Sequence, residues 1–134
     1  MSVEAILLGV AQDGGVPHTG CECAHCRRAW EDPTFRQWAV CLGLVDRTHR
    51  QSWLIDATPD FPEQLHALRE FAPDCPLAGI LLTHAHIGHY AGLIHLGREV
   101  MGTEEMPIYA TPRMAEFLRD NAPWSQLVAL RNID

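Results

Sequence analysis

Positive charge is scarce in this chain. Lys and Arg together number 10 among 134 residues, against 17 Asp and Glu, and the formal net charge is -7. The basic residues do not gather into a stripe along the sequence. Because nucleic acids and anionic membranes attract proteins through basic surfaces, the composition argues against a general binder of either. We expect no nucleic-acid partner and no membrane partner.

The chain also lacks long apolar runs and a positively charged leader. No apolar stretch approaches the about 18 residues that a membrane-spanning helix requires. The amino-terminal segment MSVEAILLGVAQDGG carries Glu4 where a secretory signal would be positive, and its apolar part is short. We therefore predict a cytoplasmic protein whose first apolar segment is a strand.

A disulfide framework is not expected either. The five cysteines are an odd number, and three of them lie within GCECAHC. The other two, Cys41 and Cys75, stand alone in apolar surroundings. This distribution favours a metal site in a reducing compartment over a set of disulfides.

What the chain does contain is enough apolar material for a real core. At 47% hydrophobic and 20% charged residues, residues 1–134 are typical of a single small domain, or of one piece of a larger one. Hydrophobic periodicity predicts a fully buried strand first, then a hairpin, then strands that alternate with helices. The predicted strands are 3–10, 36–46, 51–56, 77–82, 107–110 and 128–133, and the predicted helices are 24–31, 61–72, 90–101 and one from 112. This is an α/β or α+β layered arrangement.

Two helix starts have clear capping residues. Asp60 precedes a helical pattern with Pro62 in its first turn and is predicted to be its N-cap. Thr111 is predicted to cap a second helix, which has Pro112 at its first position.

Three histidines follow a buried strand in THAHIGH, namely His84, His86 and His89. Residues at i and i+2 past a strand point the same way, so two of these rings can reach one ion. Zinc and iron accept neutral imidazole, and a site in a loop leaves a coordination position open for water. Such an ion lowers the pKa of its water to about 7. We predict a zinc or iron site here; the alternative is a polar loop with exposed histidines.

A second metal motif lies near the amino terminus. Cys21, Cys23 and Cys26 form C-x-C-x-x-C, and three thiolates at this spacing can hold one tetrahedral zinc with a fourth ligand from elsewhere. His18 is a candidate for that ligand, and a downstream residue is an equal one. We call residues 18–26 the zinc knuckle. The alternatives are reduced cysteines that serve in packing, or a redox motif, which here lacks a strand-to-helix context.

Several segments of the sequence resemble a known family. LLTHAHIGHYAG is similar to the H-x-H-x-D-H signature of the metallo-β-lactamase superfamily, and WLIDATPD is similar to the strand-end aspartate segment that precedes it, with Asp56 as the aspartate. The block LGVAQDGGVPHTGCECAHC resembles the amino-terminal segment of the pyrroloquinoline-quinone (PQQ) biosynthesis B branch of that superfamily. Together the resemblance spans essentially the whole chain.

The resemblance implies an αββα sandwich with a metal site at one edge, between two sheets. It implies that His84 and His86 ligate a first metal, and that His89 helps to hold a second one. Asp56 would orient the histidine loop as a hydrogen-bond acceptor rather than bind metal. The related proteins are similar in carrying a structural zinc on the cysteine motif.

Two departures from the family pattern stand out. Gly88 occupies the aspartate position of the signature, which removes a carboxylate from the second metal position, so we expect one metal or a weakly held second one. The family completes its site with further histidines and an aspartate downstream, so we expect the amino-terminal half of a sandwich, with an uncovered sheet face through which it self-associates or binds a partner. Asp13 in the AQDGG loop is either a turn former or, if that loop folds over the metal, a residue at the edge of the site.

The resemblance and the motifs together lead to two hypotheses. The first is a metal-dependent hydrolase, in which metal-bound hydroxide attacks an ester, amide or phosphodiester of a small molecule; oxygen chemistry on iron is a variant, because the same ligands support both. The second is a non-catalytic zinc-stabilised module, or inactive fragment, that binds a partner or self-associates.

Overall fold

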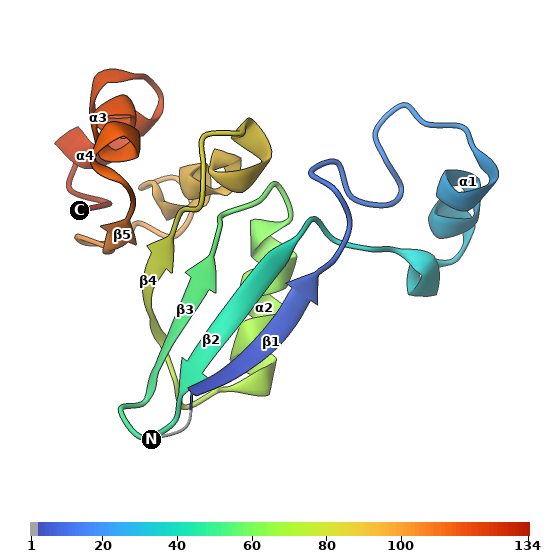
Figure 1. The fold of residues 1–134 in the computed structure, drawn as a ribbon, viewed down its shortest axis with the longest axis horizontal. Helices are drawn as coiled ribbons and strands as arrows, with labels where there is room; N and C mark the ends of the chain where they lie inside the picture. The colour runs from blue at the N-terminus through green and yellow to red at the C-terminus, as the bar shows by residue number, and fades with distance from the viewer. Residues whose placement is uncertain (1–2) are drawn as a thin grey trace.

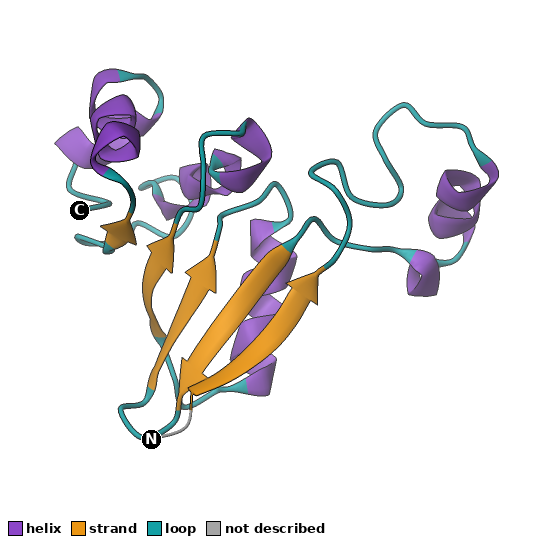
Figure 2. Ribbon diagram, viewed as in Figure 1, coloured by secondary structure: helices purple, strands orange, loops and turns teal. Residues whose placement is uncertain are grey.

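The computed structural model describes residues 3–134 and is built on one mixed sheet with the strand order β1-β2-β3-β4-β5 (Figure 2). The first three strands pair antiparallel, and β3, β4 and β5 pair parallel. Their bounds are Val3–Gly9, Cys41–Asp46, Gln51–Ile55, Leu77–Leu81 and Ile108–Tyr109. The predicted α/β class is confirmed.

Four α-helices and three short 3₁₀ helices complete the described fold. The α-helices are α1 (Ala24–Glu31), α2 (Phe61–Phe71), α3 (Pro112–Asp120) and α4 (Trp124–Ala129), and the 3₁₀ helices are η1 (Pro33–Phe35), η2 (Ile87–His89) and η3 (Ala91–Leu96). Helix α2 lies along one face of the sheet (Figure 1). Its Phe61 and Leu68 are fully buried in the same core as Leu54 and Ile80 of the sheet. Burying each such side chain contributes about 1.5–3 kcal/mol. No helix within residues 3–134 combines the length and the hydropathy that a membrane span requires.

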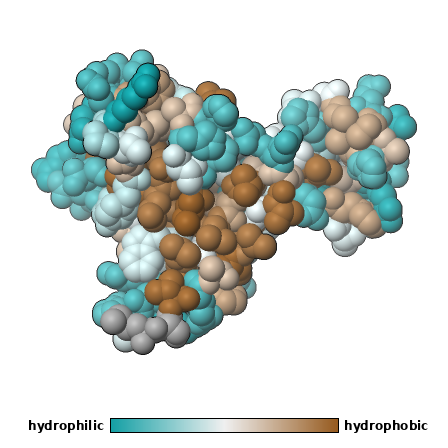
Figure 3. All heavy atoms as spheres, in the orientation of Figure 1, coloured by the Kyte–Doolittle hydropathy of each residue, from teal (hydrophilic) through white to brown (hydrophobic). Residues whose placement is uncertain are grey.

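The opposite face of the sheet is open to solvent, and we call it the open face. The register places Leu7 beside Leu42, Leu42 beside Ile55, and Ile55 beside Leu81, so these side chains share one face. Leu7 is 70% exposed. Figure 3 shows apolar side chains gathered over this face. The prediction that the first strand is fully buried is therefore wrong, because only the face turned toward α2 is covered.

Tertiary contacts correct two local predictions, and a third is confirmed. Asp60 stands at the start of α2, but its carboxylate accepts a hydrogen bond from the Ala39 N–H at 2.7 Å rather than capping the helix. The segment 90–101 forms the 3₁₀ helix η3 instead of an α-helix, since Gly92 docks against the backbone after β3 and donates its N–H to Ala57 O at 2.9 Å. The predicted cap at Thr111 is confirmed: its Oγ1 accepts from the Met114 N–H at 3.3 Å.

The segment 128–133 contains the last two residues of a helix and then a turn, and only Ile133 takes part in β pairing. Helix α4 is anchored by Trp124, whose ring packs on Tyr90 with centroids 4.7 Å apart and whose Nε1 donates to Tyr90 O at 3.3 Å. Only Ile133 from this segment forms a β-bridge, to Met106. The predicted strand is thus reduced to this one bridge, because α4 continues to Ala129 and a turn follows it.

The topology brings several loops to one edge of the sheet. Because β1 and β3 each pair antiparallel with β2, they run in the same direction, and β4 and β5 run parallel to them. The loops that follow β1, β3 and β4 therefore leave from the same edge (Figure 1). These loops carry Asp13, Asp56 and the three histidines of THAHIGH.

Candidate metal centre

Asp56, the residue directly after β3, is the centre of the hydrogen bonding at this edge. It is 5% exposed and adopts a positive φ of 70°, a conformation that Asp and Asn tolerate better than most residues. Its carboxylate accepts hydrogen bonds from Thr83 N at 2.8 Å and from Thr83 Oγ1 at 2.8 and 2.9 Å. It also accepts from Nδ1 of His89 at 2.7 Å. Asp56 therefore holds both ends of the histidine loop.

The same network assigns the tautomers of two histidines. His89 is 8% exposed, and its Nδ1 faces the acceptor-only carboxylate of Asp56, so Nδ1 carries the proton. The hydroxyl of Thr83 donates to Asp56 and accepts from Nδ1 of His84, 2.9 Å away. His84 consequently presents an unprotonated Nε2, which is the form that binds a metal. His89 is held through Nδ1, and its Nε2 faces a second carboxylate, that of Asp13, at 3.1 Å.

The three histidine rings lie together. The ring centroids of His84 are 4.6 Å from those of His86 and 4.0 Å from those of His89. Nε2 of His84 and Nδ1 of His86 are 3.1 Å apart. Two imidazole nitrogens on one zinc, each about 2.0–2.1 Å from it, are separated by about 3.3 Å in tetrahedral geometry. The His84–His86 pair therefore fits a single ion.

Asp13, from the loop after β1, also lies at this edge. Its Oδ1 is 3.1 Å from Nε2 of His89, and its side chain is 49% exposed. Of the two alternatives for Asp13, the structure therefore favours a residue at the edge of the site. The AQDGG loop does fold back to the histidines, a contact between residues 76 positions apart in the sequence.

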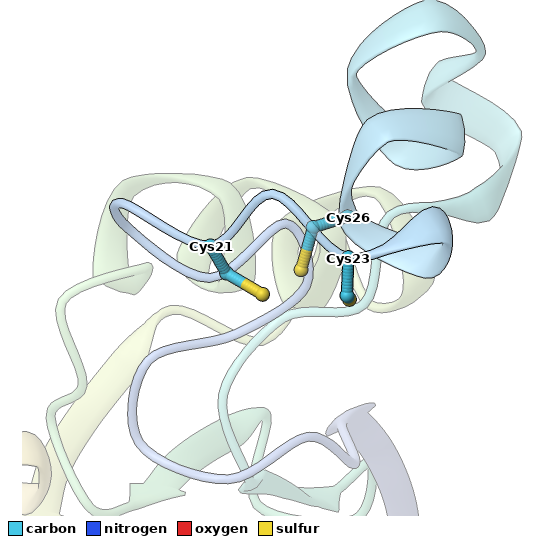
Figure 4. A group of neighbouring side chains, drawn as sticks. All are labelled: Cys21, Cys23 and Cys26. Carbon is cyan, nitrogen blue, oxygen red and sulfur yellow. The ribbon is translucent and has the colours of Figure 1, made fainter.

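The cysteine knuckle is the more compact ligand group. The ligand atoms of Cys21, Cys23 and Cys26 all lie within 4.8 Å of one another, and within residues 3–134 no other group of at least three potential ligands is as close. Figure 4 shows the three side chains gathered beside the loop that leads into α1. Thiolates about 2.3 Å from a zinc ion are separated by about 3.8 Å, so the group could hold a metal ion.

The thiols of the zinc knuckle differ in pKa. Hydrogen bonds from the backbone of Cys26, and from the thiols of Cys21 and Cys26, lower the pKa of Cys23 to about 7. The backbone N–H of His18 lowers the pKa of Cys26, but desolvation together with the neighbouring Cys21 and Cys23 raises that pKa above its ordinary value overall. One exposed thiol is thus ready to lose its proton to a metal at neutral pH.

His18 takes part in the knuckle through its backbone. Its N–H donates to Sγ of Cys26 at 3.3 Å, whereas its ring lies beside Gly14 and is not part of the cysteine group. The role of the ring as a fourth ligand stays a prediction.

A pocket of about 360 Å³ adjoins His84. Its lining comprises His84, Ala85, Thr111, Arg113, Met114 and Phe117. Arg113 is exposed and lies in the first turn of α3. It gives the pocket a permanent positive charge beside His84. Sequence reasoning missed this residue, because nothing in the local pattern connects the start of α3 with the histidine loop.

Comparison with known proteins identifies relatives of the chain. Residues 52–132 match the family described as a beta-lactamase superfamily domain. The chain is 32% identical over 133 residues to coenzyme PQQ synthesis protein B of Rhodopseudomonas palustris strain TIE-1, which covers 93% of this chain and 41% of that protein. It is 35% identical over 100 residues to coenzyme PQQ synthesis protein B of Methylobacterium sp. strain 4-46. That match covers 70% of this chain and 33% of the Methylobacterium protein.

Two solved structures share the fold. The Zn²⁺-bound PqqB from Methylobacterium extorquens superposes with a TM-score of 0.75 at 26% identity, over 93% of this chain and 46% of that chain. A diphosphatase of the PhnP family superposes with a TM-score of 0.70 at 28% identity, over 100% and 49% of the two chains. The chain thus spans less than half the length of each of these relatives. It corresponds to the amino-terminal part of the PqqB proteins. The resemblance inferred from the sequence segments is confirmed.

Proposed function

Because the chain belongs to the beta-lactamase superfamily, we propose that it carries the histidine ligands of a metal-dependent hydrolase that acts on a small phosphate ester. The observation that carries the proposal is the hydrogen-bond chain from His84 through Thr83 to Asp56 and His89, which holds both rings through Nδ1 and directs both Nε2 atoms toward the neighbouring ligand candidates, His86 and Asp13. Zinc or iron at such nitrogens lowers the pKa of a bound water to about 7 and so supplies a nucleophile at neutral pH.

The residues of the histidine site would then have distinct roles. Nε2 of His84 and Nδ1 of His86, at a separation of 3.1 Å, would hold the first ion. Asp56 fixes the tautomer and the orientation of His89, and through Thr83 those of His84. Partners of this kind tune metal affinity by about 10–100-fold.

The pocket beside His84 supports an anionic substrate. Arg113 lines this pocket, and a guanidinium recognises phosphate oxygens through paired hydrogen bonds. The structural similarity to a diphosphatase agrees with a phosphate-containing substrate rather than an amide. It also makes hydrolysis the first reaction to test, before oxygen chemistry on iron.

A second candidate function rests on the compactness of the cysteine knuckle. Within residues 3–134, Cys21, Cys23 and Cys26 form the only group of at least three potential ligands whose ligand atoms lie within 4.8 Å of one another. A chain that binds zinc only there would be a zinc-stabilised module without a catalytic metal. The two functions differ in how many metal ions depend on the histidines.

Metal analysis of the purified chain separates the two. The metal content per chain is measured by mass spectrometry for the wild type, for His84→Ala/His86→Ala, and for Cys21→Ser/Cys23→Ser. The control is His66→Ala, an exposed histidine on α2. Hydrolysis of bis(p-nitrophenyl) phosphate is followed in the same preparations.

The proposal expects two independent losses. The histidine variant loses metal but keeps the cysteine-dependent zinc, and it loses phosphodiester hydrolysis with it; the control changes neither. A wild type whose entire metal content depends on the cysteines would refute the histidine centre and establish the zinc-stabilised module. Histidine-dependent metal without any hydrolysis would refute the hydrolase alone.

A further inference from the structure

Residue 88 and Asp13 compete for one space. A Cβ placed on Gly88 would lie 2.5 Å from Cβ, 2.7 Å from Cγ and 2.9 Å from Oδ2 of Asp13. Contacts below about 3 Å are too short for carbon atoms that do not bond, so a side chain at position 88 would displace Asp13. The carboxylate of Asp13 therefore stands where a side chain of residue 88 would begin.

The same carboxylate faces the free nitrogen of His89. Nδ1 of this buried ring is occupied by Asp56 at 2.7 Å, and its Nε2 lies 3.1 Å from Oδ1 of Asp13. The His89 ring, which is 10% exposed, is thus fixed on one side and directed at Asp13 on the other. Asp13 itself is half-exposed and reaches the ring from the solvent side.

We propose that Asp13 supplies the carboxylate that Gly88 lacks, and that Asp13 and His89 together hold a second metal ion beside the His84–His86 pair. This inference rests on the proposed metal centre. The 3.1 Å between Nε2 and Oδ1 is close to the separation of two ligands that each lie about 2.0–2.2 Å from one ion. The rings of His84 and His89 are 4.0 Å apart, so the two metal positions are neighbours, as in two-metal hydrolytic sites.

The glycine is then a requirement of the site rather than a lost ligand. A short carboxylate from the loop after β1 can approach His89 only if position 88 has no side chain. The chain meets this condition, and the pairing of an aspartate at 13 with a glycine at 88 preserves one carboxylate next to His89. The competing account is an ion pair, in which His89 donates hydrogen bonds to both Asp13 and Asp56 and no metal binds between them.

Exchanging the two positions tests the inference. The variants are Asp13→Asn, Gly88→Asp, and the exchange Asp13→Gly/Gly88→Asp, with Asp74→Asn as a control that removes one exposed carboxylate elsewhere. After chelation, zinc or manganese is titrated into each variant by calorimetry, and the bound metal is counted by mass spectrometry. Thermal melting of the metal-free chains reports on folding.

The expected pattern is a loss followed by a rescue. Asp13→Asn, which has the same shape, binds the second ion at least about 10-fold more weakly while melting close to the wild type. Gly88→Asp alone melts lower, because two side chains then occupy one space. The exchange restores both the melting temperature and the second metal.

Three outcomes would overturn the inference, and they are distinguishable. Wild-type stoichiometry and affinity in Asp13→Asn would identify Asp13 as an ion-pair partner only. An exchange variant no better than Gly88→Asp would show that the two positions are not equivalent. If His84→Ala/His86→Ala also fails to change the metal content, the proposed metal centre itself fails; if only the Asp13 variants are silent, that centre stands and Asp13 has no part in it.

Discussion

Replacing Asp56 by Asn changes one atom of the buried network and leaves its shape intact. Asn is chosen because it tolerates the positive φ of 70° at this position. Its Oδ1 can still accept from the N–H and the hydroxyl of Thr83, at the 2.8 and 2.9 Å now seen. The other terminal atom becomes an NH₂ group that faces Nδ1 of His89, where a carboxylate oxygen now accepts at 2.7 Å.

The magnitude follows from that single contact. A hydrogen bond to a charged group is worth about 1.5–3 kcal/mol and a neutral one about 1 kcal/mol. The variant exchanges one for the other, so we expect a loss of about 0.5–2 kcal/mol in the free energy of unfolding. For a chain of 134 residues, that lowers the melting temperature by roughly 2–7 °C.

Metal binding is expected to suffer more than stability. When the NH₂ group donates to Nδ1 of His89, the ring proton moves to Nε2, and a protonated nitrogen cannot be a ligand. We expect metal affinity at the histidine centre to fall by about 10–100-fold. The assay is calorimetric titration of zinc into the chelated chain, with melting of the metal-free chain alongside and Asp74→Asn as control. Unchanged zinc affinity in the Asp56 variant would refute the tautomer assignment, and an unchanged melting temperature would refute the hydrogen-bond estimate.

Three further predictions concern other parts of the chain. Burial, with the nearby charge of Asp56, raises the pKa of Cys41 from 9.0 to about 12, so above pH 9 the unfolded chain has released a proton that the folded chain retains. The free energy of unfolding should therefore fall by about 1.4 kcal/mol per pH unit between pH 9 and 12. Urea unfolding at pH 8, 9 and 10 should show a shallower decline of this free energy in Cys41→Ala than in the wild type. Equal slopes in the two chains would contradict the raised pKa of Cys41. The open face should let two copies cover each other, so the sedimentation of the wild type should depend on concentration. Leu7→Lys should be monomeric, whereas the control Val100→Lys, at a similarly exposed site of 63%, should still associate. A monomeric wild type would contradict this prediction. Arg113→Ala should raise KM for an anionic phosphodiester at least about 10-fold with little change in kcat, whereas an equal KM would remove Arg113 from substrate binding.

Both metal motifs could be recognised without coordinates because their spacing is local. Histidines two and three residues apart, and cysteines two and three residues apart, can reach one ion in almost any loop that follows a strand or precedes a helix. The structure does gather the three rings and the three thiols. The alternation of strands and helices in the second half was equally readable, since it reflects hydrophobic periodicity within each segment.

Predictions from local patterns were wrong where a contact with a distant segment sets the local structure. Asp60 stands at the N-cap position of α2, as its residue type predicts, but its carboxylate accepts a hydrogen bond from the Ala39 N–H and none from the helix. The apolar residues of 128–133 suit a strand, but α4, anchored by the contact of Trp124 with Tyr90, continues to Ala129, and only Ile133 forms a β-bridge. In each case the competing contact comes from a segment that is remote in the sequence, so no window of neighbouring residues contains the information.

The sequence by itself determined which side chains could hold a metal and in which loop they lie. It could not determine how the carboxylates are shared among them. Gly88 suggested a missing ligand, and only the tertiary structure shows Asp13 in the space above that glycine, facing His89 from 76 residues away. The physical reason is topological: β1, β3 and β4 run in one direction, so loops from distant parts of the chain meet at a single edge of the sheet.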